Sequence, residues 1–305
     1  MDITKKIMNR IISLGCSYAI DVAENNVRQC EILNIEVLHN NQQSHFPGSS
    51  IELLLENVKN RTNLKRFKDY KFIMDITQVG RLSKKIPNEI VKELSEYGEL
   101  FLDNYGGKDE PNGIVNLDLQ IVEKLANWSE NNYFDIFSTN MDIESKKEGY
   151  PKKYKEWWEK EWKLHYLKSI EDHIKDYLIT IKKIQDELIG YDYKMYLMNN
   201  TFEGYFYKDN ILQHKYSNHN EYTIPDLKNT IEVKDLYPKL WKDIDLSKFT
   251  FYSTNGNTYG GLDEYTIDNF SKDYLQDYGH NDLTPFGKHP NIKVQRDFLN
   301  KMILN

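Results

Sequence analysis

Two apolar runs of strand length most constrain the fold of this chain. Residues 10–14 read Arg-Ile-Ile-Ser-Leu and stop at Gly15, and residues 71–77 read Lys-Phe-Ile-Met-Asp-Ile-Thr. Short continuous apolar runs that end at a breaker are typical of strands buried on both faces, as in parallel sheets. The first 80 residues are therefore expected to contribute at least two strands to a buried parallel sheet.

The segments between these two runs predict the crossovers that a parallel sheet requires. We expect a helix over 18–31 and a second strand over 35–39. Residues 47–50 (Pro-Gly-Ser-Ser) predict a turn in which Ser49 or Ser50 caps a helix that starts at 51. Strand, helix, strand, helix, strand within 80 residues indicates an α/β fold.

The rest of the chain continues this alternation around one irregular region. Residues 151–190 predict a long amphipathic helix, with a proline at its start and a glycine at its end. The other elements expected are helices over 117–127 and 292–304 and strands over 193–198 and 249–252. Together they predict a single domain over 1–305, with an irregular, helical insertion at about 82–165.

Composition excludes several classes of function. The chain has 305 residues, a formal net charge of −7 and only two cysteines. An acidic chain whose basic runs are interleaved with acidic and apolar residues is not expected to bind nucleic acid, because such binding requires a concentrated basic face. Two cysteines cannot build a metal motif, and we expect neither a metal nor a cofactor.

The sequence also predicts no membrane association. No segment approaches the ~20 consecutive apolar residues of a membrane span. The run before Cys16 resembles a lipoprotein signal only faintly, because Arg10 leaves about five residues where a signal needs roughly 7–15. We expect a cytoplasmic location where the protein is made.

Ser17 follows the first strand and Gly15 directly, at the carboxyl end where open α/β sheets bind ligands. With a helix expected after it, free N–H groups and the helix dipole would favour developing negative charge there. Two interpretations are open on this segment alone. Ser17 is either a nucleophile that attacks a carbonyl or the N-cap of the next helix.

A serine nucleophile requires a base, and His289 is the best placed of the eight histidines. It lies in a loop just before the last expected helix, and Pro290 restricts the backbone after it. A loop histidine with no catalytic role is the alternative. Four other histidines are expected in helix packing, on the surface or in a polar loop: His165, His173, His214 and His219.

Four segments resemble the sequence blocks of SGNH (GDSL) hydrolases, in the right order. Gly15-Cys16-Ser17-Tyr18 is similar to the first block, in its Gly-Cys-Ser variant, and Pro47-Gly48-Ser49-Ser50 to the second. Residues 73–81 are similar to the third block of a variant subgroup, in which Thr-x-x-x-Arg replaces Gly-x-Asn-Asp. His289-Pro290-Asn291 resembles the last block.

The resemblance implies a three-layer α/β/α sandwich with a parallel sheet of about five strands, the flavodoxin-like SGNH hydrolase fold. It implies Ser17 as nucleophile and His289 as base, with the Gly48 N–H and the Gln78 side-chain amide as oxyanion-hole donors.

It further implies that Arg81, Ser49 and Thr77 bind substrate, with Arg81 at an anionic or hydroxyl-rich part of it. For Arg81, a salt bridge that fixes the end of the strand is an equal alternative.

The acid of the triad is missing from the family's usual place, where this chain has Phe286. Asp282 is the nearest upstream carboxylate and the expected acid, with Asp277 next. A backbone carbonyl that orients the imidazole, as in Ser-His dyads, is the third option.

These residues predict a serine esterase that forms an acyl-enzyme on Ser17 and hydrolyses an O-acyl ester, O-acetyl among them, of a carbohydrate or small molecule. No oligomeric state is predicted. The alternative is a catalytically weak or inactive SGNH module that acts as a binding or structural protein, for example in a phage particle. The missing aspartate favours this alternative. A phosphate-binding flavodoxin-like domain fits less well, because Gly15-Cys16-Ser17-Tyr18 is too short for a phosphate loop.

Two aromatic segments could border a site. The polar, aromatic segment 252–263 is the better candidate for a rim. The other lies at helical spacing, which favours a packing face over a sugar-stacking platform. It comprises Tyr154, Trp157, Trp158, Trp162 and Tyr166.

Overall fold

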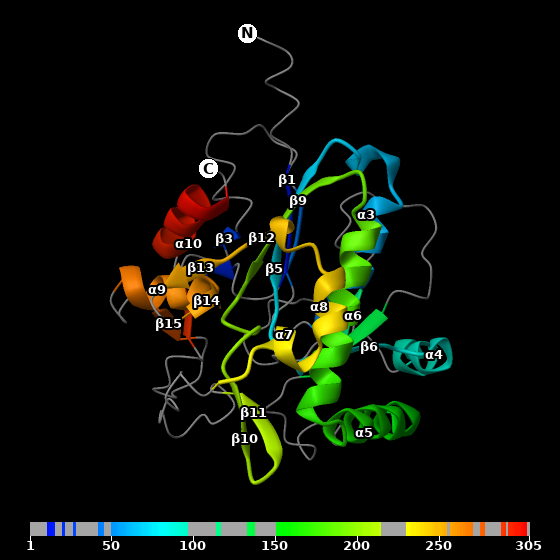
Figure 1. Ribbon diagram of the computed structural model, residues 1–305. Coiled ribbons are helices and arrows are strands. Elements are labelled where there is room, and N and C mark those ends of the chain that lie inside the picture. The colour runs from blue at the N-terminus through cyan, green and yellow to red at the C-terminus, as the bar shows by residue number, and fades with distance from the viewer. Residues whose placement is uncertain are drawn as a thin grey trace.

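A computed structural model describes most of the chain as a mixed α/β protein built on a parallel sheet (Figure 1). The described residues are 11–15, 20–21, 27–28, 42–45, 50–96, 114–116, 133–137, 151–214, 230–254, 257–270, 275–277, 288–290 and 292–303. Within these ranges, no helix is both long and apolar enough to cross a membrane.

The main sheet has five strands in the order β12-β9-β5-β1-β4, and every neighbouring pair is parallel. Counted along the chain, this order is 2-1-3-4-5, so the direction of strand addition reverses between β1 and β5. Open α/β sheets bind ligands beyond the carboxyl ends of the strands at such a reversal. The strands are β1 (Ile11–Gly15), β4 (Gln42–His45), β5 (Lys71–Ile76), β9 (Asp192–Leu197) and β12 (Phe249–Thr250).

Four of the five strands confirm the sequence-based expectations at 10–14, 71–77, 193–198 and 249–252. The second strand lies at β4, later than the expected 35–39, which falls outside the described residues. β4 is polar, with the sequence Gln-Gln-Ser-His, so an apolar run could not mark it. It pairs only with β1, at the edge of the sheet.

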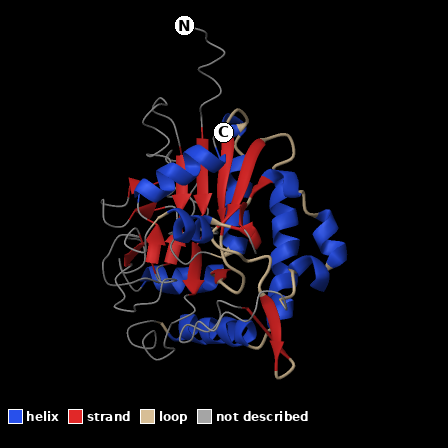
Figure 2. Cartoon of the chain, turned by 60° about the vertical axis from the view of Figure 1, so that its left-hand side comes forward, coloured by secondary structure: helices blue, strands red, loops and turns tan. Residues whose placement is uncertain are grey.

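Helices cover both faces of the sheet, as Figures 1 and 2 show. Alternate residues of β1 and β5, such as Leu14 and Met74, pack with α3 (Ile51–Thr62) and α6 (Ile170–Glu187). On the other face, Ile11 and Ile73 pack with residues of α9 (Leu262–Asn269), α10 (Ile292–Phe298) and the following π-helical turn (Leu299–Ile303). This period of two is what a strand with two buried faces requires.

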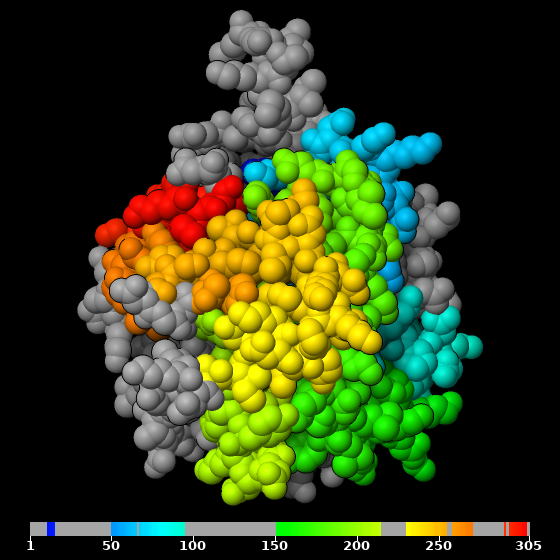
Figure 3. All heavy atoms as spheres, viewed as in Figure 1, coloured from blue at the N-terminus to red at the C-terminus, as the bar shows by residue number. Residues whose placement is uncertain are grey.

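The helical layer on the first face, formed by α3 and α6, is widened by the segment after residue 230. Figure 3 shows α6 in green beside the yellow and gold segment that contains α7 (Val233–Leu236), α8 (Pro238–Asp243) and a 3₁₀ turn (Leu246–Lys248). Gln185 of α6 ties this segment down, since its side-chain amide both donates to the Asp245 carbonyl and accepts from the Asp245 N–H, each at 2.9 Å.

Two helical expectations are confirmed and one needs correction. Ser50 caps α3 by accepting from the Leu53 N–H, and α10 begins where the last helix was expected. The pattern over 151–190 is two helices, α5 (Lys152–Tyr166) and α6, rather than one. Ser169 causes the break, because its hydroxyl caps α6 by accepting from the Asp172 N–H at 3.1 Å.

The helix expected over 18–31 is wrong for the described part of that segment. β2 (Ile20–Asp21) and β3 (Val27–Arg28) form an antiparallel pair instead. Asn25-Asn26 precedes β3, and asparagine favours turns over helix interiors. The N-cap interpretation of Ser17, and the helix dipole invoked for it, therefore lose the helix on which both depended.

Between the main-sheet strands β5 and β9 the chain forms a second, antiparallel sheet in the order β6-β8-β7. It consists of β6 (Leu82–Lys85), β7 (Ile114–Asn116) and β8 (Tyr133–Phe137). α4 (Asn88–Glu96) and α5 share a hydrophobic cluster with β6, in which Tyr154 and Trp158 are buried. Strands were not expected in this region, and the helix expected over 117–127 lies outside the described residues.

Three short antiparallel pairs complete the fold. They are β10 (Tyr205–Lys208) with β11 (Ile211–His214), β13 (Tyr252–Thr254) with β14 (Asn257–Gly260), and β15 (Leu275–Asp277) with β16 (Lys288–Pro290). Asp209 and Asn210 have φ of 52° and 62° between β10 and β11, which is the backbone of a two-residue hairpin turn.

A close contact joins β1 to β5 at the point where the sheet order reverses. A Cβ atom at Gly15 would lie 2.6 Å from the Cβ of Asp75 and 3.2 Å from its carbonyl oxygen. Asp75 is fully buried, so neither group can move aside without shifting a strand. Only glycine fits at the end of β1.

We predict that Gly15→Ala lowers the free energy of unfolding by about 1–3 kcal/mol or more, as overpacking does in cores. Asp75→Gly removes the atom that the new methyl group would meet. The double variant is therefore expected to be more stable than the sum of the single changes predicts, by about 0.5–3 kcal/mol. Urea denaturation of the wild type, the two single variants and the double variant measures this coupling. If the changes in unfolding free energy of the single variants simply add up in the double variant, the steric explanation is contradicted.

Candidate functional site

The predicted oxyanion and nucleophile residues follow three adjacent strands. In the order β4-β1-β5, Gly15 is in register with His45, and Leu14 with Met74, so these strands end close together. Ser17 comes two residues after β1, Gly48 three after β4 and Gln78 two after β5. Of the predicted site residues, Ser17, Gly48, Ser49 and Asp282 lie outside the described residues.

His289 lies in β16, and the structure describes its backbone position but not its side chain. β16 runs beside β2, with Cα atoms of the two strands within 8 Å. β2 begins three residues after Ser17, so the strand of His289 lies beside a strand that follows the predicted nucleophile closely in the sequence. In the β15–β16 pair, Gln276 lies opposite His289, and Asp277 lies one position away, opposite Lys288.

Thr77 is the first residue beyond β5 and is only 2% exposed. Its carbonyl accepts a 2.6 Å hydrogen bond from the Tyr177 hydroxyl of α6. Its own hydroxyl has no hydrogen-bond partner among the residues described. Burial raises the pKa of Tyr177 well above its usual range, with a further contribution from Tyr205 and Asp75, so this phenol remains a neutral donor.

Arg81 ends the turn that follows β5. Its Nη2 donates to the Met198 sulfur at 3.9 Å, and its Nη1 is buried without a hydrogen-bond partner. Among the described residues, no carboxylate accepts a hydrogen bond from Nη1, and the salt bridge weighed for this strand end stays a prediction. The guanidinium charge acts on the buried Tyr177 hydroxyl nearby.

Asn200, which was not among the residues predicted for the site, organises the loop after β9. Its N–H donates to Glu264 at 3.1 Å, and its side-chain amide donates to Glu203 at 2.6 Å. Its carbonyl accepts from Nε2 of His214 at 3.1 Å. Because that ring nitrogen also donates to the Glu203 carbonyl, it carries a proton and cannot hold a metal.

Two buried carboxylates tie this loop to the segment predicted as a rim. Glu203 accepts from the Thr258 and Tyr259 N–H groups, and Glu264 accepts from the Gly261 N–H at 2.8 Å. A Cβ atom at Gly261 would lie 2.2 Å from the Leu197 carbonyl, so this segment lies directly against the end of β9. The signal was available at Met198-Asn199-Asn200-Thr201, a polar run immediately beyond an apolar strand.

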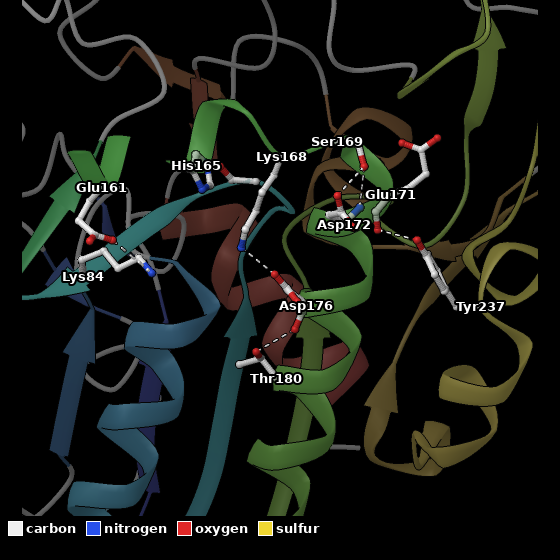
Figure 4. Close-up of polar contacts among 11 residues, drawn as sticks. Lys84, Glu161, His165, Lys168, Ser169, Glu171, Asp172, Asp176, Thr180 and Tyr237 are labelled. Atoms are coloured by element: carbon white, nitrogen blue, oxygen red, sulfur yellow. Dashed lines mark hydrogen bonds and ion pairs between the residues drawn. The ribbon is translucent and has the colours of Figure 1, made fainter. Parts of the chain in front are cut away.

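The α5–α6 corner supports the Thr77–Arg81 turn from outside the sheet, and Figure 4 shows this corner. Nε2 of His165 donates to the Gly80 carbonyl at 2.7 Å, while Gly80 has the positive φ of 85° that a tight turn needs. The rings of His165 and His173 lie 4.3 Å apart. Lys168 and Asp176 close the corner with a 2.8 Å ion pair.

Both corner histidines favour the neutral form. Burial lowers the pKa of His165, against the opposing hydrogen bond to Gly80 and the charge of Glu52. Burial, together with the neighbouring His165 and Lys168, lowers the pKa of His173 to about 4, against the effect of Asp176. Protonating the pair would place two cations with ring centroids 4.3 Å apart beside Lys168.

The Trp-rich face of α5 is divided between packing and solvent. Tyr154 and Trp158 are buried, which confirms the packing interpretation for these two residues. Trp162 stacks on Tyr166 with ring centroids 5.0 Å apart, and Tyr166 is 73% exposed.

Within the described ranges, no group of three or more His, Cys, Asp or Glu side chains is placed to hold a metal ion. Comparison with family models, with curated proteins and with solved structures finds no match to this chain.

The corner histidines predict a dependence of stability on pH. Between pH 6.5 and about 4 the unfolded chain binds more protons at His173 than the folded chain, so the free energy of unfolding falls as the pH is lowered through this window. His173→Gln removes this contribution and should show a smaller fall in Tm than the wild type. The exposed Lys175→Gln on the same helix is the control. Parallel Tm–pH curves for His173→Gln and the wild type would contradict the assignment.

Proposed function

We propose that the protein is a serine esterase of SGNH type that uses Ser17 as nucleophile and His289 as base. The observation that carries this proposal is the order β4-β1-β5 at the reversal of the sheet. Each of these three strands is followed within three residues by one predicted participant: Gly48, Ser17 and Gln78. The strand order 2-1-3-4-5, with helices on both faces, is that of flavodoxin-like folds, and we assign the SGNH variant of it.

The approach of β16 to β2 supports His289 as the base. Among the eight histidines, His214 has its Nε2 proton committed to two carbonyls, and His165 donates to Gly80 on the α5–α6 corner. The strand of His289 lies next to β2, which begins three residues after Ser17.

In the proposed mechanism, His289 accepts the Ser17 proton as the hydroxyl attacks an ester carbonyl. The N–H groups of Ser17 and Gly48 and the Gln78 amide stabilise the oxyanion. The alcohol leaves with the proton from His289, and water activated by the same imidazole releases the acyl group as an acid. The substrate class proposed is an O-acyl ester of a carbohydrate or small molecule.

The second candidate is an SGNH module without catalytic power that serves as a binding or structural protein. Phe286 at the usual place of the acid favours it. Asp282 and Asp277 are the carboxylates proposed to replace that acid, and the register of β15 with β16 keeps Asp277 within one position of His289.

A fluorophosphonate probe and short p-nitrophenyl esters test the proposal. We expect the wild type to be labelled and to hydrolyse the esters, and Ser17→Ala to lose both. His289→Gln should lower the rate by about 10³-fold or more while the fold is kept, because the serine then lacks its base. Ser247→Ala, an exposed serine of the 3₁₀ turn, is the matched control.

If the wild type is neither labelled by the probe nor hydrolyses the esters, the esterase proposal fails and the binding or structural module is the remaining candidate. Labelling that persists in Ser17→Ala would place the nucleophile on another residue.

A further inference from the structure

The turn from Thr77 to Arg81 presents two polar groups that the described structure leaves without a partner. Nη1 of Arg81 and Oγ1 of Thr77 are buried from solvent, and neither has a hydrogen-bond partner among the described residues. The other terminal nitrogen of Arg81 donates to the Met198 sulfur, a weak acceptor, at 3.9 Å. Buried donors are normally paired, and a buried cation most strongly so.

The backbone of the turn that carries these two groups is held in place by neighbouring side chains. Tyr177 donates to the Thr77 carbonyl, and His165 donates to the Gly80 carbonyl, so both ends of the turn are fixed by helices. The next strand along continues this support, since Met198 donates its N–H to the Ile76 carbonyl at 3.2 Å. Fixed donors lose little conformational freedom when a ligand binds.

The position of the turn is also that of a ligand site. It follows β5, one of the two strands between which the sheet order reverses. Arg81 brings a positive charge to this turn, and its guanidinium presents forked N–H groups that match a carboxylate or a phosphate. The Asp75 carboxylate, two residues before Thr77, is buried within the strand.

We propose that this turn is an anion subsite, in which Arg81 and Thr77 bind a carboxylate or phosphate group of the ligand. Combined with the proposed esterase, on which this step rests, the substrate is an ester that carries a negative charge close to its acyl group, such as an acylated acidic carbohydrate. Arg81 is the residue that selects the charge, and the Thr77 hydroxyl adds a neutral hydrogen bond. The subsite itself does not require catalysis.

Direct binding tests the subsite without reference to activity. The full-length protein is titrated by calorimetry with succinate and, separately, with inorganic phosphate at constant ionic strength. We expect Arg81→Gln to weaken binding of the preferred anion by about 10- to 100-fold and Thr77→Val by about 2- to 10-fold, from the loss of a charged and a neutral hydrogen bond. Tighter binding of succinate or of phosphate tells whether the anionic group of the ligand is a carboxylate or a phosphate.

Two controls keep this test decisive. Arg296→Gln removes an exposed arginine of α10 and should leave the affinity unchanged. Arg81→Lys retains the charge without the fork and should bind with intermediate affinity, which also covers the case in which Arg81→Gln unfolds. Absence of binding to both anions in the wild type, or equal affinity in Arg81→Gln, would overturn the subsite.

Hydrolysis separates this inference from the proposed function. Mono-p-nitrophenyl glutarate carries a carboxylate, and p-nitrophenyl butyrate is its neutral counterpart. We expect Arg81→Gln to raise KM for the first ester alone. If the wild type binds succinate or phosphate through Arg81 but hydrolyses neither ester, the esterase fails and the subsite stands. If both esters are hydrolysed and Arg81→Gln leaves their ratio unchanged, the subsite fails and the esterase stands.

Discussion

The packing of Gly15 against Asp75 is the contact on which the candidate site depends. It lets β1 and β5 lie close together beyond their last registered pair, Leu14 with Met74, at the reversal of the sheet order. A side chain at Gly15 would separate the two strands at the end of β1. The same contact buries the Asp75 carboxylate in the sheet, where burial is tolerated only when surrounding groups compensate the charge.

Beyond this contact, buried polar groups rather than apolar packing organise the carboxyl edge of the sheet. Glu203, Glu264 and Asn200 join the loop after β9 to the segment 258–261, and Tyr177 with His165 holds the turn after β5. Networks of this kind are stable only when their members are satisfied, and they then fix one arrangement. Thr77 and Arg81 each carry a buried polar atom without a hydrogen-bond partner among the described residues, and the proposed anion subsite is built on these two groups.

The sequence predicted the elements whose signals are local. β5 is a continuous apolar run, and α3 carries an apolar stripe behind a serine cap, so each could be recognised within its own residues. β4 and the β6-β8-β7 sheet were not expected, because β4 is polar and β6 is stabilised by pairing with β8, about 50 residues away. The break between α5 and α6 was missed because the apolar spacing runs through it, while the Ser169 cap decides it.

The candidate site divides in the same way. The resemblance pointed to Thr77 and Arg81, whereas the hydrogen-bond partners of Arg81 depend on packing that no local pattern encodes. Asn200 escaped notice because its partners, Glu203, His214 and Glu264, meet it only through the tertiary fold. The helix expected after Ser17 failed because a short segment with two asparagines is weakly specified by its own residues.

The most direct test of the account is a crystal structure of the protein after reaction with a fluorophosphonate. The account predicts phosphorus bonded to Oγ of Ser17, with a ring nitrogen of His289 about 2.6–3.2 Å from that oxygen. The phosphonyl oxygen should face the Gly48 N–H and the Gln78 amide at the ends of β4 and β5. An adduct on another residue, or a His289 ring that points away from Ser17, would contradict the assignment of this edge of the sheet as an esterase site.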